Sequence, residues 1–341
     1  MDAYVESIGS FTPTTVSEYA IPWMKRTYPT VKSSTKRGVA IHIQHLVDAI
    51  GEKQLSELVP SDIKGVYSDH YSGLSNTYIN SAKQIYCSVF DAAVADGLIR
   101  FNPARDKSAK PHRGKKAKER ILSPDERQWI TTLCVNHRTW PAVMAMLYAG
   151  IRPQEMKAFD IDRDVDFEHN VITVRETVHV DGQKYDYTDE MKTDWSARQI
   201  PLFPPLKEAL EGKHGMLITS AHGEKVTIQT WKVAWNSYKY AMETAINGCP
   251  KRWYGKRKED AGKTLHPWIE FDIVPYTLRH AFCCMCRDYG VEINTCRKWM
   301  GHADTQMILK VYDSVSTDRF VSESQKVIDR LNGGQFGGQI E

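Results

Sequence analysis

One stretch of strand-like alternation inside an otherwise helical sequence most constrains the fold. Residues 170–180, "NVITVRETVHV", alternate apolar and polar side chains, and Asp181-Gly182 is a hairpin turn signal before the return segment 183–188. "ARQIPL" at 197–202 predicts a third short strand. The other apolar patterns have a helical period, so the sequence predicts a mostly α fold with a small antiparallel sheet.

The first part of the chain has the pattern of a small helical domain. After a short segment at 1–12, residues 13–102 contain apolar positions at helical spacing, with Gly51 and Gly97 at the ends of two such segments. Four or five helices with short turns would form one compact bundle.

A basic, proline-containing segment follows at 103–122 and predicts a linker, because it has no apolar period. The overall net charge is only +3. Between 105 and 120, however, two acidic residues stand against eight cations: Arg105, Lys107, Lys110, Arg113, Lys115, Lys116, Lys118 and Arg120. A second basic stretch, 251–263, mixes cations with aromatic residues. Both stretches could follow a phosphate backbone, and the alternative is that they are solvated loops.

The second domain, predicted at 123–315, combines helices with the small sheet. It opens at a capping box formed by Ser123 and Glu126. The remaining segment, 316–341, has the pattern of an amphipathic helix that docks either on its own domain or on a neighbouring protomer.

Several classes of protein are disfavoured by the composition. No run of about 18 apolar residues predicts a membrane span, and the first residues lack a signal-peptide core, so a cytoplasmic protein is expected. Seven cysteines without regular spacing indicate reduced thiols. Cys283, Cys284 and Cys286 would point in different directions on a helix, and no metal site is expected there.

Arg152, in "GIRPQE", is the first candidate for chemistry. It is expected at the start of a helix, where unpaired N–H groups and a guanidinium together can bind a phosphate, with Glu155 bracing the arginine. The alternative is an ordinary Arg–Glu pair on a helix surface.

Two further cations are candidates. Lys192 lies between a strand ending near Thr188 and another beginning near Ala197, where a lysine is either a mobile proton donor or simply exposed. Arg279, in "YTLRH", follows a proline-led helix start.

His302 and Tyr312 flank the last apolar stretch. Tyr312 is four residues after Ile308 on the expected inward face of a helix, which locally favours a buried aromatic. On one unbroken helix His302 and Tyr312 would be roughly 80° apart, so they could converge only through the break at Gly301.

In order along the chain, "GIRPQE", "KTDWSARQIPL", "YTLRH", "MGH" and "VY" resemble the motifs of the tyrosine recombinase (phage integrase) family. The resemblance implies a helical core DNA-binding domain joined to an α+β catalytic domain. It implies that Tyr312 attacks the scissile phosphate to form a 3′-phosphotyrosyl intermediate, without cofactor or metal. Arg152, Arg279 and His302 would stabilise the transition state, and Lys192 would protonate the 5′-oxygen.

Two features depart from the family pattern. Tyr276 stands where the family usually has a histidine, and a phenol of ordinary pKa near 10 is a poor base at neutral pH. The group that deprotonates Tyr312 is therefore open. In addition, few residues precede the first helix, so the sequence either lacks the arm-binding domain of many integrases or is a truncated form.

The resemblance implies a recombinase that integrates and excises a mobile element such as a phage or conjugative transposon. The alternatives are a Xer-like chromosome or plasmid dimer resolvase, a catalytically silent DNA-binding factor, and a relaxing topoisomerase. Implied partners are double-stranded DNA with core sites, a homotetramer formed through exchange of the C-terminal helix, and accessory excision and host DNA-bending proteins. The candidate DNA-binding cations are Lys36, Arg37, Arg113, Lys115 and Lys116.

Overall fold

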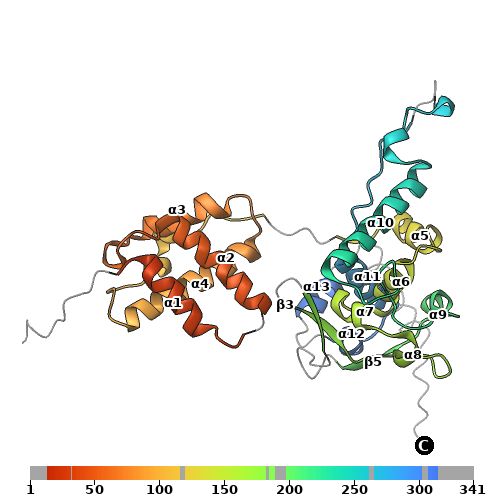
Figure 1. Ribbon diagram of the computed structural model, residues 1–341, viewed down its shortest axis with the longest axis horizontal. Coiled ribbons are helices and arrows are strands. Elements are labelled where there is room, and N and C mark those ends of the chain that lie inside the picture. Colours follow the sequence, from red (N-terminus) through yellow and green to blue (C-terminus); the bar gives the residue numbers. More distant parts are fainter. Residues whose placement is uncertain are drawn as a thin grey trace, which may run out of the picture. The chain divides into compact units, whose positions relative to one another are not determined.

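The computed structural model describes residues 14–31, 33–115, 120–181, 184–188, 197–260, 265–301 and 306–313. The chain divides into two compact units (Figure 1). The first holds residues 1–119, and the second holds the rest apart from residues 180–182 in a hairpin.

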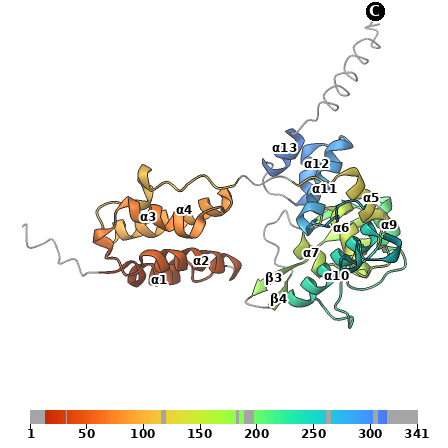
Figure 2. The same ribbon diagram turned by 90° about the horizontal axis from the view of Figure 1, so that it is seen from above.

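The first unit is a bundle of four long helices. They are α1 (Val16–Thr27), α2 (Ser33–Ile50), α3 (Pro60–Tyr71) and α4 (Asn76–Ala95), with a 3-10 turn, η2, at Leu55–Glu57. In Figure 2, α1 and α2 form one layer and α3 and α4 the other. Helix α1 begins at a capping box in which Thr15 and Glu18 satisfy each other's backbone N–H groups. The predicted helical bundle is confirmed by these elements.

Residues 103–115 pack against this bundle, although their sequence suggests linker. They form two 3-10 turns, η3 (Pro103–Arg105) and η4 (Lys107–Ala109), and bury Ala104 and Ala109 in the core of the first unit. Small apolar residues alternate with the cations here, so the chain buries the former while the latter stay in water.

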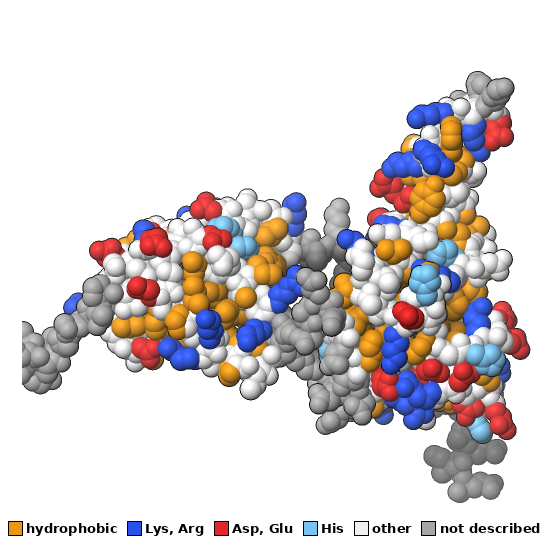
Figure 3. Space-filling view, viewed as in Figure 1, with side chains coloured by type: hydrophobic (Ala, Val, Ile, Leu, Met, Phe, Trp, Pro, Cys, Tyr) orange, Lys and Arg blue, Asp and Glu red, His pale blue; other side chains and the backbone are white. Residues whose placement is uncertain are grey.

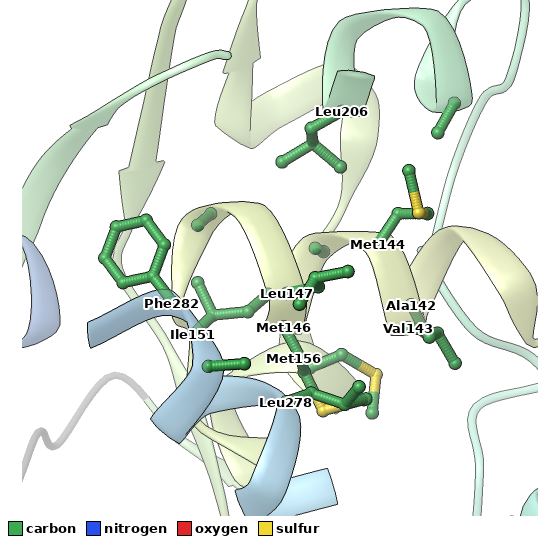
Figure 4. Packing of buried hydrophobic residues seen from close by; sticks show 14 of the residues in the cluster. Ala142, Val143, Met144, Met146, Leu147, Ile151, Met156, Leu206, Leu278 and Phe282 are labelled. Carbon is green, nitrogen blue, oxygen red and sulfur yellow. The ribbon is translucent and has the colours of Figure 1, made fainter. Parts of the chain in front are cut away.

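The second unit is built around α6 (Trp140–Ala149), which is buried on nearly every side. Figure 4 shows its side chains interleaved with those of α9 (Pro204–Leu210) and α11 (Pro275–Asp288). The other elements are α5 (Pro124–Thr132), α7 (Pro153–Ala158), α8 (Ile161–Asp164), α10 (Ile228–Asn247), η5 (Lys251–Trp253), η6 (Lys258–Asp260), α12 (Ile293–Met300) and α13 (Gln306–Asp313).

The small antiparallel sheet has the strand order β1-β2-β5, from β1 (Val165–Asp166), β2 (Val171–Val174) and β5 (Arg198–Pro201). Strands β2 and β5 pair so that Val174 lies opposite Arg198. A separate hairpin joins β3 (Thr177–Asp181) to β4 (Lys184–Thr188).

The predicted single strand at 170–180 is wrong in one respect, because it divides into β2 and β3 at Arg175-Glu176. The carboxylate of Glu176 pairs with Arg163 at 2.6 Å, and the guanidinium of Arg175 lies 3.4 Å from Asp164. These ion pairs to α8 interrupt the pairing, so β2 continues the sheet while β3 forms the hairpin.

The predicted C-terminal helix at 316–341 lies outside the described residues. Within the described ranges, no helix is both long and apolar enough to cross a membrane.

Candidate active site

The turn between α6 and α7 places Arg152. Gly150 ends α6 with φ of 59°, and a Cβ atom on it would lie 2.4 Å from the Phe282 ring. Only glycine fits both the left-handed backbone and this close approach. Arg152 then precedes Pro153 as the N-cap of α7.

Glu155 is the counter-ion of the site. Its side chain is 2% exposed, and Oε2 accepts the backbone N–H of Arg152 at 2.8 Å while Oε1 pairs with the Arg152 guanidinium. Arg198 binds the same carboxylate through Nη1 (3.0 Å) and Nη2 (2.8 Å). This is a buried shared carboxylate, not a pair on a helix surface.

The buried charges shift one another's pKa. Burial disfavours the charged form of Glu155, but Arg198, Arg152 and Arg279 together outweigh burial, so the pKa of Glu155 falls to about 2. Burial lowers the pKa of Arg279 to about 9, opposed by Glu155 and assisted by Arg152 and Arg198. At neutral pH, Glu155 is thus anionic and Arg279 cationic.

The C-terminal end of α12 gathers three guanidinium groups on consecutive carbonyl oxygens. Arg198 Nε donates to the Trp299 oxygen at 2.6 Å, Arg279 Nη2 to the Met300 oxygen, and Arg152 Nη2 to the Gly301 oxygen. Arg279 also donates to the Gly150 oxygen. A helix C-terminus carries partial negative charge, so it complements a cluster of cations. Arg152 and Arg279 are therefore brought together beside the turn that leads to position 302.

Tyr276 lies in the first turn of α11, three residues before Arg279, and is 59% exposed. Its phenol lies near enough to Arg279 to raise the pKa of that guanidinium slightly, against the larger effect of burial. An exposed phenol at this position can donate a hydrogen bond to an anion bound by the arginines.

Tyr312 is placed differently. Its hydroxyl donates to the Val291 carbonyl oxygen at 2.9 Å, and its ring packs on the core of the second unit. Burial and then the neighbouring Cys296 thiol raise the pKa of Tyr312. In this conformation the hydroxyl is docked at Val291 and is a poor nucleophile.

Lys192, His302 and Lys116 lie outside the described residues. The strand ends that flank Lys192, at Thr188 and Arg198, match the predicted positions closely.

The other candidate DNA-binding cations, Lys36, Arg37, Arg113 and Lys115, are exposed on the first unit. In the second unit, Figure 3 shows Lys and Arg side chains beside hydrophobic ones at the far end of α10. There Lys251, Arg252, Trp253 and Lys256 are exposed. Such a mixture suits contact with a nucleic-acid backbone.

Among the described residues, no group of three or more His, Cys, Asp or Glu side chains could hold a metal ion. The Cys283 and Cys296 sulfur atoms lie 3.9 Å apart as free thiols. The cations that the structure brings together are three arginines, and they suit an anionic group such as a phosphate.

Sequence reasoning missed Arg198. The available signal was spacing: Arg198 and Ile200 lie two residues apart in a predicted strand and so face the same side, and the structure shows that both are buried. A buried arginine requires a carboxylate partner. Glu155 was already marked as a brace for Arg152.

No family model matches the chain. The chain is 23% identical to the transposase from transposon Tn916 of Enterococcus faecalis over 311 residues, which is 88% of this chain and 74% of the relative. It is similar to the structure of the Tn1549 transposon integrase in complex with transposon right end DNA, with a TM-score of 0.71 and 20% identity over 92% of this chain and all of that one. It is also similar to a lambda integrase tetramer bound to a Holliday junction, with a TM-score of 0.56 and 15% identity over 89% and 85% of the two chains.

These similarities confirm the resemblance to tyrosine recombinases and the predicted fold, which is mostly α with a small antiparallel sheet.

Proposed function

We propose that this chain is a site-specific DNA recombinase that cleaves and rejoins DNA through a 3′-phosphotyrosyl intermediate. One observation carries the proposal: Arg152, at the start of α7, and Arg279, in α11, converge on consecutive carbonyl oxygens at the end of α12, and the buried Glu155 carboxylate pairs with Arg152. Three arginines against one glutamate leave a net positive charge that suits a phosphodiester.

The proposed chemistry assigns a role to each group. The Tyr312 hydroxyl gives its proton to water as its oxygen attacks phosphorus, and the bond to the 5′-oxygen breaks, leaving a 3′-phosphotyrosine and a 5′-hydroxyl. Arg152, Arg279 and His302 stabilise the charge of the pentavalent transition state. Lys192 gives its proton to the departing 5′-oxygen. Because the new ester keeps the bond energy, a second 5′-hydroxyl can reverse the step without ATP.

The docked position of Tyr312 adds a conformational step. Its hydroxyl must leave the Val291 carbonyl before it can reach a phosphate held by the arginines. We propose that DNA binding shifts α13 to release it. Tyr276 then serves as a hydrogen-bond donor to the phosphate and not as the base.

The biological substrate we propose is the ends of a mobile element, which the recombinase integrates and excises. Support comes from the relatives, whose names are those of transposon and phage proteins. A chromosome or plasmid dimer resolvase would use the same site. A silent DNA-binding factor is favoured only by Tyr276, and the complete arginine cluster argues against it.

We propose a homotetramer on DNA as the active assembly, in which residues 316–341 of one protomer dock on the next. The second unit offers an apolar pocket of about 260 Å³, lined by Tyr148, Phe203, Met285, Tyr289 and Val291 among others. Tyr289 is 82% exposed at this pocket, more than any other exposed large hydrophobic side chain described. A large exposed apolar side chain beside such a pocket indicates a docking site.

We also propose that accessory excision proteins and host DNA-bending proteins are partners of the recombinase, and that it acts in the bacterial cytoplasm.

The test is a duplex with a nick beside the recombination site, so that the cleaved strand escapes and the covalent adduct accumulates. Wild type should form an adduct that survives denaturation, and Tyr312→Phe should bind the duplex equally well without forming it. An adduct in the Tyr312→Phe variant would reject Tyr312 as nucleophile.

A further inference from the structure

Arg198 joins three parts of the second unit through one side chain. It begins β5, binds Glu155 on α7, and donates to the Trp299 carbonyl at the end of α12. One side chain thus connects the sheet, α7 and α12 directly.

The contacts use the full shape of the guanidinium group. Nη1 and Nη2 bind the two carboxylate oxygens of Glu155 at 3.0 and 2.8 Å, and Nε binds the Trp299 oxygen at 2.6 Å. The ammonium group of a lysine has no such planar fork and could not satisfy all three acceptors in these directions.

Burying the guanidinium of Arg198 destabilises the fold unless a carboxylate pairs with it. The side chains of Arg198 and Glu155 are 5% and 2% exposed, so both charges have lost most of their water. Arg152 approaches the same carboxylate and is 28% exposed, which leaves part of its guanidinium accessible to a ligand. Arg198 thus occupies the inner side of Glu155 and Arg152 the outer side.

These contacts connect Arg198 to both arginines of the proposed catalytic set. Through Glu155, Arg198 orients Arg152, and through Trp299 it holds the helix end whose next carbonyls bind Arg279 and Arg152. Along the chain, it stands six residues after Lys192 and fixes the point where that segment rejoins the sheet.

We infer that Arg198 is a positioning residue for DNA cleavage, which sets the geometry of Arg152 through the shared Glu155 carboxylate. The inference rests on the proposed function. Arg198 does not itself contact the phosphate, and its loss should act by letting Glu155 and the end of α12 move.

A binding experiment tests this without relying on cleavage. In a Tyr312→Phe background, affinity is compared for a duplex with the scissile phosphate and for one with a neutral methylphosphonate there. The Tyr312→Phe protein should prefer the phosphodiester by about tenfold, because charge-assisted hydrogen bonds are lost with the charge. Adding Arg198→Lys should bring the two affinities close to equal while leaving affinity for the methylphosphonate duplex unchanged.

Arg175→Lys is the matched control, since Arg175 is an exposed arginine just beyond β2. It should keep the full preference. Glu155→Gln removes the carboxylate through which Arg198 acts on Arg152, and it should lose the preference for the phosphodiester as Arg198→Lys does. This variant provides the test if Arg198→Lys does not fold. Undiminished preference in a folded Arg198→Lys or Glu155→Gln variant overturns the inference. No preference in Tyr312→Phe alone overturns the proposed function, and the inference with it.

A double-mutant cycle on cleavage separates positioning from general damage. With Tyr312 intact, Arg198→Lys should slow single-turnover cleavage by on the order of 100-fold. In an Arg152→Ala background the same change should cost less than about threefold, because the residue it acts through is gone. Additive losses would mean that Arg198 acts independently of Arg152.

Discussion

At the scale of single residues, Lys157 is a further buried cation whose environment differs from that of Arg198 and Arg279. It is 3% exposed, and its ammonium group lies 4.7 Å from the Tyr185 ring centroid and 5.1 Å from that of Trp231. Burial lowers its pKa to about 8. The aromatic faces recover only part of the cost of removing the charge from water.

Lys157→Met should therefore stabilise the protein at pH 7, by up to about 3 kcal/mol from the lowered pKa, less the lost aromatic contacts. The unfolded chain binds this proton up to the ordinary lysine pKa near 10.4, and the folded chain releases it near 8. Between these two pKa values the free energy of unfolding of the wild type should rise relative to that of the variant. The stability advantage of the variant therefore shrinks toward pH 10. Chemical unfolding between pH 7 and 10 measures it, with Lys232→Met as an exposed control. A variant less stable at pH 7 would contradict the prediction.

Residue-scale prediction from sequence succeeded where a motif fixes backbone geometry. Arg152 could be placed because the proline that follows it is a local signal of a helix start. The partner of Arg198 could not be deduced, because 43 residues separate it from Glu155. Nor could the hydrogen bond of Tyr312 to Val291, because it depends on how α12 and α13 pack.

At the scale of elements, the segment between β4 and β5 carries the proposed proton donor. Its two ends are set by the hairpin and by the β2–β5 pairing, and Lys192 lies between them. The sequence predicted both strand ends but not the division of β2 from β3, since that depends on ion pairs to α8.

Lys192→Ala should slow cleavage of a normal duplex by on the order of 100-fold or more, as expected for loss of a general acid. A 5′-sulfur leaving group needs no proton, so most of the loss should vanish on a 5′-phosphorothiolate duplex. Single-turnover cleavage of the two duplexes gives the comparison, and Lys213→Ala provides an exposed-lysine control. Equal losses on both would exclude Lys192 as the acid.

At the scale of the whole molecule, the proposed tetramer requires a surface on one protomer that receives a segment of another. The apolar pocket beside Tyr289 is formed by side chains from α6, α9 and α11, which are distant in sequence. The amphipathic pattern of residues 316–341 was visible in the sequence, but the pocket that could receive it was not.

Met285→Glu should place a charge in that pocket and prevent tetramer formation on a four-way junction, as should deletion of residues 316–341. Both variants should still bind a single core site. Sedimentation of the DNA complexes counts the protomers, with Val135→Glu as an exposed apolar control outside the pocket. Wild-type assembly by Met285→Glu would remove this pocket from the interface.

The most direct test of the proposed recombinase is the chemical identity of its trapped adduct. After cleavage of the nicked duplex, protease digestion and mass spectrometry should find the DNA on the peptide containing Tyr312, joined through a 3′-phosphate, with a free 5′-hydroxyl on the released strand. DNA attached to another residue, or joined through a 5′-phosphate, would contradict the proposed mechanism.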